Sequence, residues 1–137
     1  AYTALADRSN APGVFSAIIG CEYTTECANN LHRNVLFRDG SIRANQTLPF
    51  SQYDSKNPED LWAHLAEYEA RSGGEVLAIA HDGNLSNGRM LSLNAYDGSP
   101  LTVEIAEARA HGSSRSTRRR RSRATARRTP PSAPTTS

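Results

Sequence analysis

Three side chains that could bind a divalent metal ion lie at the ends of predicted strands. Glu22 follows an apolar stretch, His32 lies near the start of a second stretch, and His81 comes directly after a third. Binding and catalytic groups collect at strand ends in parallel α/β sheets. A glutamate and two histidines from separate elements are a suitable ligand set for zinc, manganese or iron. Taken singly, each is better explained as an ordinary polar group, so the prediction depends on all three meeting.

The turn that begins at His81 contains further candidates. Asp82, Asn84 and Asn87 lie in the segment 81–88, which is rich in Gly and Asn. Their side chains could hold a ligand or orient a metal-bound imidazole. A capped turn with a hydrogen-bonded histidine is the alternative, and composition alone favours it.

Other charged and titratable residues have simpler explanations. His64 lies on a predicted helix and is expected at the surface. Arg38 and Arg89 could bind anions, but solvated surface charge is the simpler account.

The elements that must position the candidate ligands are three strands. Residues 14–23 are β-branched, aromatic and almost wholly apolar, which predicts a buried strand. Residues 31–37 alternate imperfectly before a turn at Asp39 and Gly40, which predicts a second strand. Residues 76–80 form an apolar run with no polar face, as expected of a central parallel strand covered on both sides.

A helix is predicted over residues 58–72. Asn57 is suited to cap it, Pro58 suits its first position, and Gly73 provides the stop. Apolar side chains recur between these limits at helical spacing. The order strand, helix, strand then predicts an α/β fold.

The remaining segments are less regular. Residues 41–56 lack a period and contain Pro49, which predicts a long loop of the kind that is often functional. A weaker helix is predicted over about residues 100–110.

Length and composition limit the class of protein. The 137 residues are enough for one modest domain, here residues 1–110. No run approaches the roughly 18 apolar residues of a membrane-spanning helix, and the chain opens without a basic and then apolar leader. We therefore expect a soluble protein without a membrane partner, of unknown compartment. Cys21 and Cys27 fit no C-x2-C metal signature.

A basic tail, residues 111–137, differs sharply from the rest. Residues 110–137 hold eight arginines and no acid, which leaves residues 1–109 with a net charge of −6. The tail lacks large apolar side chains and is expected to be disordered. Its guanidiniums could bind nucleic acid through phosphate, but without interleaved aromatics such binding would be non-specific.

Long blocks of the body resemble a known family. Residues 30–40 read NLHRNVLFRDG and residues 81–88 read HDGNLSNG. With residues 12–24 and residues 58–62 at the start of the predicted helix, these blocks are similar to the uncharacterised family domain of unknown function 3604, over residues 12 to about 109. That family resembles the PHP (polymerase and histidinol phosphatase) superfamily of metal-dependent hydrolases, which are built on a distorted β/α barrel.

The resemblance implies a fold and a site. It implies that the chain is a fragment of a PHP-like barrel, in which Glu22, His32 and His81 are metal ligands. It also implies attack of a metal-activated water on a phosphoester or related bond. The superfamily's opening H-x-H, its early Asp-His pair and its closing D-x-H are absent from this chain. We therefore expect weak or no metal binding and no activity from this chain alone; the substrate and the oligomeric state stay open.

The tail also departs from the family pattern. Family members continue with a segment like WEPLYEVTQIKGDGEAHP, and loss of one base near codon 111 in a GC-rich gene would turn such a segment into the observed Arg-rich one. We hypothesise that residues 112–137 are out-of-frame translation. Two alternatives remain: a nucleic-acid-binding protein that uses the tail, and a metal-free binding module.

Overall fold

The computed structural model describes residues 2–25 and 29–113, with side chains described up to residue 110. Mixed helices and strands make up this part of the chain. In order they are α1 (Tyr2–Ser9), β1 (Ile19–Tyr23), β2 (Arg33–Phe37), α2 (Ser41–Ala44), α3 (Pro58–Ser72), β3 (Val76–Ala80), a 3-10 turn (Gly83–Leu85) and α4 (Val103–Ser113). Most of the basic tail, residues 114–137, lies outside the described residues. The prediction that the tail is disordered falls on those residues as well.

The three strands form an open antiparallel sheet in the order β1-β2-β3. Ile19 of β1 pairs with Phe37 of β2, and Phe37 also pairs with Val76 of β3. The predicted mixture of helix and sheet is therefore confirmed, but the expectation of a central parallel strand over 76–80 is wrong. β3 is antiparallel to β2 and lies at an edge of the sheet.

The path of the chain between β2 and β3 explains this direction. The loop before α3 runs to the far end of the sheet, where the Ser55 carbonyl accepts a hydrogen bond from the Tyr23 hydroxyl at 3.0 Å. α3 then returns to the end at which β2 finished, and β3 starts beside Phe37. The connection thus covers the length of the sheet twice, so β3 must run opposite to β2.

α3 has the predicted bounds, because its signals are local. The Asn57 side chain accepts a hydrogen bond from the backbone N–H of Glu59 at 2.9 Å, and Pro58 takes the first position. Gly73 ends the helix in the left-handed conformation, with φ of 63°.

His64, expected at the surface, is instead half-buried, because Thr47 and Phe50 pack beside it.

Other boundaries differ from the prediction. The first strand starts at Ile19 rather than at residue 14, and Val14 is 89% exposed. No described strand pairs with residues 14–18, so their apolar character alone does not make a strand there. The predicted loop 41–56 contains the short α2, and the C-terminal helix begins three residues later than expected. The sequence reasoning did not identify α1.

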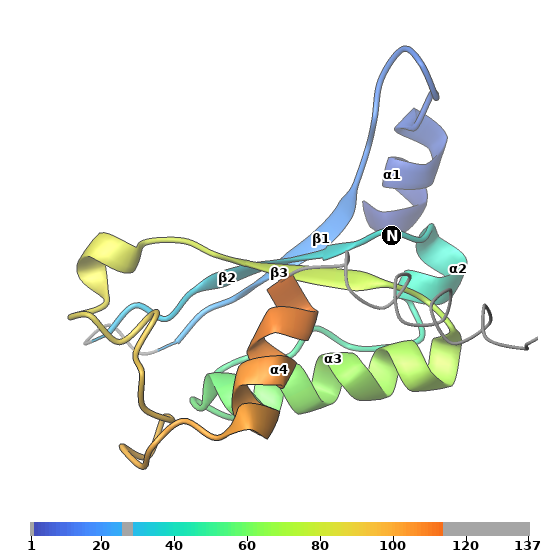
Figure 1. The fold of residues 1–137 in the computed structure, drawn as a ribbon. Helices are drawn as coiled ribbons and strands as arrows, with labels where there is room; N and C mark the ends of the chain where they lie inside the picture. Colours follow the sequence, from blue (N-terminus) through green and yellow to red (C-terminus); the bar gives the residue numbers. More distant parts are fainter. Residues whose placement is uncertain (1, 26–28, 114–137) are drawn as a thin grey trace, which may run out of the picture.

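α3 and α4 lie on one side of the sheet, which we call the covered face, whereas α1 stands on the other side, close to α2 (Figure 1). Its core consists of buried apolar residues from the strands and from α3, including Tyr23, Val35, Phe37, Leu65 and Tyr68. The opposite side, which we call the open face, carries Ile79 with 44% of its surface exposed. The expectation that residues 76–80 are covered on both sides is therefore wrong.

Close strand packing on the open face requires a glycine in β1. A Cβ atom at Gly20 would come within 2.9 Å of Leu36 Cδ2 and of the Val35 carbonyl oxygen. Gly20 thus lets β1 and β2 approach two residues before Glu22.

Among the helices of the described residues, none is both long and apolar enough to cross a membrane.

Candidate metal centre

The register of the sheet brings Glu22, His32 and His81 to one end of the open face. Arg33 pairs with Ala80, and the His81 N–H donates to the His32 carbonyl at 3.3 Å, which extends the pairing by one step. His32 and His81 are therefore opposite one another, and side-chain alternation directs both to the open face. Glu22 pairs with Asn34, so it is the diagonal neighbour of His32 on the same face.

The ligand atoms of these side chains lie close together. One carboxylate oxygen of Glu22 and one ring nitrogen of each histidine are all within 4.8 Å of one another. Glu22 Oε1 is 3.1 Å from His32 Nδ1 and 3.4 Å from His81 Nε2. The two imidazole rings meet edge to face, with their centroids 5.8 Å apart.

These distances suit a divalent cation such as zinc. Nitrogen and oxygen ligands lie about 2.0–2.2 Å from zinc, so neighbouring ligands of a tetrahedral site are roughly 3.3–3.5 Å apart. The two distances from Glu22 are close to that separation. In addition, His81 Nε2 is buried and makes no hydrogen bond to the described residues. A buried ring nitrogen that makes no hydrogen bond is the kind of atom that a metal ion would satisfy.

Asp82 adds a second carboxylate at the edge of the cluster. Its Oδ2 lies 3.4 Å from His81 Nδ1 and 4.0 Å from His32 Nδ1. The Asp82 backbone is left-handed, with φ of 57°, and this conformation turns the chain out of β3. Second carboxylates beside ligating imidazoles commonly hold the ring in place.

The other two predicted turn residues lie apart from these contacts. Asn84 is exposed in the 3-10 turn, and the Asn87 amide donates to the Asn29 side chain at 3.4 Å. The contact between Asn87 and Asn29 does not involve a candidate ligand.

The charge around the cluster favours a cation. Glu22 and Asp82 are each 45% exposed, and their ion-pair distances within the described residues are to the two histidines. No described Lys or Arg pairs with either carboxylate. The same geometry also serves a metal-free role, in which His32 donates to Glu22 and fixes the strand ends. The proximity of the three residues therefore leaves their role as ligands a prediction.

Sequence reasoning missed a buried cation on the other face. Arg33 follows His32, but it lies on the covered face and only 5% of it is exposed. The sequence did contain a signal for the burial of Arg33. Alternation along the strand places it on one face with Leu31, Val35 and Phe37, which are all apolar.

Comparisons with known proteins add a family. A family model with the description "Protein of unknown function (DUF3604)" matches residues 1–115. No curated protein matches the chain, and no solved structure matches it.

Proposed function

The chain belongs to the DUF3604 family, and from that premise we propose that Glu22, His32 and His81 form part of the divalent metal centre of a metal-dependent hydrolase. The observation that carries this proposal is the meeting of three donor atoms, from three separate strand ends, within 4.8 Å. The sequence separates these residues by as many as 59 positions, so a local turn does not account for their meeting.

Each side chain has a definable task at such a centre. Glu22 would provide the charged oxygen ligand, while His32 and His81 would provide neutral ring nitrogens. Asp82, 3.4 Å from His81 Nδ1, would accept the proton of that nitrogen and leave Nε2 free to bind. When bound, the cation would activate a water molecule and polarise the scissile bond.

We assign the parent protein to the PHP-like hydrolases, with a phosphoester as the substrate class. The family blocks around residues 30–40 and 81–88 support this assignment. The antiparallel order of β1, β2 and β3 differs from the parallel strands of a regular β/α barrel, so the sheet does not add to that support. Three ligands hold a cation less tightly than the full set of such a site. This chain is therefore expected to bind metal weakly and to be inactive alone.

An intact member of the family that contains the missing ligand motifs tests the proposal. It should retain zinc, manganese or iron on purification, measured by elemental analysis, and should hydrolyse p-nitrophenyl phosphate until a chelator is added. Replacing the residue equivalent to His81 by Ala should remove both the metal and the activity. Replacing the equivalent of His64 should leave the metal content unchanged. Unchanged metal content after loss of the His81 equivalent would instead assign that residue to a structural turn.

We further propose that the basic tail is out-of-frame translation. The family match ends at residue 115, close to residue 112, where the shifted frame would begin. Resequencing the gene should show that one added base near codon 111 opens a frame that continues the family pattern. If the downstream DNA contains no such frame, the out-of-frame hypothesis is wrong and the arginine-rich arm becomes the explanation to test for nucleic-acid binding.

A further inference from the structure

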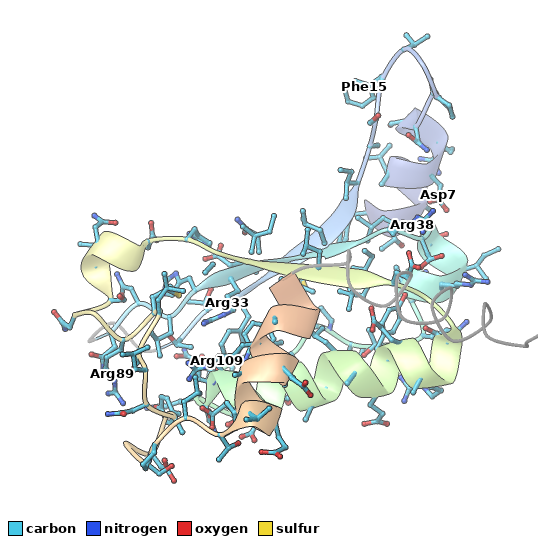
Figure 2. The ribbon with its side chains drawn as sticks, viewed as in Figure 1. Asp7, Phe15, Arg33, Arg38, Arg89 and Arg109 are labelled. Atoms are coloured by element: carbon cyan, nitrogen blue, oxygen red, sulfur yellow. The ribbon has the colours of Figure 1, made fainter. Side chains whose placement is uncertain are left out.

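Three arginines line a hollow on the covered face of the sheet. Arg33 comes from β2, Arg89 from the segment after the 3-10 turn, and Arg109 from α4. Figure 2 shows all three on the side of the sheet that carries α4, away from Asp7 and Arg38. The hollow has an empty volume of about 340 Å³, part of it open to solvent.

The buried end of the hollow is the Arg33 side chain. Its guanidinium donates to the Leu31 carbonyl at 2.7 Å and stacks on Trp62, with 5.0 Å between its carbon and the ring centroid. A guanidinium has five N–H donors, and no carboxylate among the described residues forms an ion pair with Arg33. Burial lowers the pKa of Arg33; the Tyr23 hydroxyl opposes this shift and the nearby Arg109 adds to it.

A buried charge without a counter-ion is unfavourable. Removing a guanidinium from water costs several kcal/mol unless an opposite charge and hydrogen bonds compensate for it. Trp62 compensates in part through the face of its ring. An anion in the hollow would supply both the opposite charge and the missing hydrogen-bond acceptors.

The rest of the lining keeps the hollow positive and holds its shape. Among the described residues, Glu59 is the one carboxylate of the lining, so three guanidiniums and one carboxylate give this part of the chain a net charge of +2 at the hollow. Arg109 contacts Glu59 at 3.3 Å and also donates to two carbonyls, at Ser92 and Asn94. These contacts tie α4 to the segment that contributes Arg89. Arg89 itself donates to the Tyr96 carbonyl at 3.1 Å and lies over the Tyr96 ring.

We propose that this hollow binds a phosphate group, held by the Arg33 and Arg89 guanidiniums with Arg109 as the positioning residue. The net charge of +2 matches a dianion, and the planar fork of each guanidinium matches the spacing of phosphate oxygens. The site is separate from the candidate metal centre, because Arg33 and His32 direct their side chains to opposite faces of the sheet.

Trp62 gives this proposal a local reporter. It is the single tryptophan of the chain and stacks on Arg33, so its fluorescence reports on the hollow rather than on phosphate bound elsewhere. The full chain is titrated with inorganic phosphate at pH 7.5, with ionic strength held constant by sodium chloride. We expect a saturable change in Trp62 emission. Methyl phosphate in a second arm distinguishes the end of a phosphorylated molecule from the free ion, and acetate in a third should bind more weakly because it carries one charge.

Substitutions of the arginines test whether phosphate binds in the hollow. Arg33→Met should weaken phosphate binding at least about tenfold, since a charge-assisted hydrogen bond of this kind contributes that much or more. Arg89→Gln, at an exposed position, should weaken it about three- to tenfold without affecting folding. Arg38→Gln is the matched control, because it removes an exposed arginine at the other end of β2; binding should change less than about twofold.

The proposal fails under either of two results. One is a wild-type Trp62 signal that phosphate does not change. The other is a loss of affinity in Arg38→Gln as large as that in Arg89→Gln, which would assign the effect to overall charge. Circular dichroism of Arg33→Met shows whether that variant is folded, and Arg89→Gln decides the outcome if it is not.

Discussion

His32 and Arg33 are neighbours in the chain, but they lie on opposite faces of the sheet and in opposite kinds of proposed site. His32 lies on the open face beside two exposed carboxylates, Glu22 and Asp82. Arg33 lies on the covered face, in a hollow with two further arginines. The period of two in a strand is sufficient to separate a centre suited to a cation from one suited to an anion.

The two faces also differ in what they contribute to stability. The covered face packs against α3 and α4, whereas Leu77 and Ile79 on the open face are 36% and 44% exposed. Free energy of folding should therefore come mainly from the covered face, and the open face is left for chemistry or for contact with other molecules.

The largest expected effect tests this division directly. Leu65 is 4% exposed and belongs to the core, so Leu65→Ala should lower the free energy of unfolding by about 2–5 kcal/mol. Ile79→Ala, on the open face, should lower it by less than about 1 kcal/mol. Urea unfolding followed by circular dichroism measures both. Similar losses in the two variants would mean that the open face is packed in solution.

The second effect concerns the buried guanidinium. Without phosphate, Arg33→Met should leave the free energy of unfolding unchanged or raise it by up to about 4 kcal/mol, because an apolar side chain replaces an uncompensated buried charge. Phosphate should stabilise the wild type but not the variant. Thermal unfolding with and without phosphate compares the two proteins. A strongly destabilised variant would show that the described protein groups already compensate the charge of Arg33.

A smaller effect appears at alkaline pH. Burial raises the pKa of the Tyr23 hydroxyl to about 12. Above its ordinary pKa, near pH 10, the unfolded state loses this proton while the folded state keeps it. The unfolded state then binds fewer protons, so the free energy of unfolding falls as the pH rises from about 10 to about 12. Tyr23→Phe should reduce that fall, as measured by urea unfolding at a series of pH values. An equal fall in both proteins would assign the alkaline sensitivity to other groups.

The smallest expected effect on stability is that of changing Glu22, on the open face, in the absence of metal. Glu22→Gln keeps the size of the side chain and removes an exposed charge, so the free energy of unfolding should change by less than about 1 kcal/mol. Differential scanning calorimetry in the presence of a chelator measures this change. A larger loss would identify the Glu22–His32 contact as a structural hydrogen bond.

Sequence reasoning succeeded where the signals were local. Asn57, Pro58 and Gly73 act on the residues next to them, so the bounds of α3 followed from their identities alone. The direction of β3 depends instead on where the loop before α3 crosses the sheet, and that path is fixed by contacts such as Tyr23 to Ser55, 32 residues apart. The direction of β3 could therefore not be predicted from the types of the residues in and around it.

The candidate site shows the same limit. The positions of Glu22, His32 and His81 at strand ends could be predicted from the apolar runs beside them. Their proximity could not be predicted, because it depends on the antiparallel pairing and register of β2 and β3. The apolar character of residues 76–80 had instead indicated a parallel strand. The hollow around Arg33 draws on residues from β2, α3, α4 and a loop, and only packing brings these together.

The central claim is that Glu22, His32 and His81 bind one divalent cation together. The most direct test is a zinc titration of the full chain at pH 7, followed by nuclear magnetic resonance of the imidazole nitrogens, with Glu22→Gln and His64→Ala as paired variants. We predict that the nitrogen signals of His32 and His81 shift together with one weak affinity, that Glu22→Gln reduces this affinity, and that His64→Ala does not. If His32 and His81 shift independently, or if Glu22→Gln leaves the affinity unchanged, the three residues are not one metal centre.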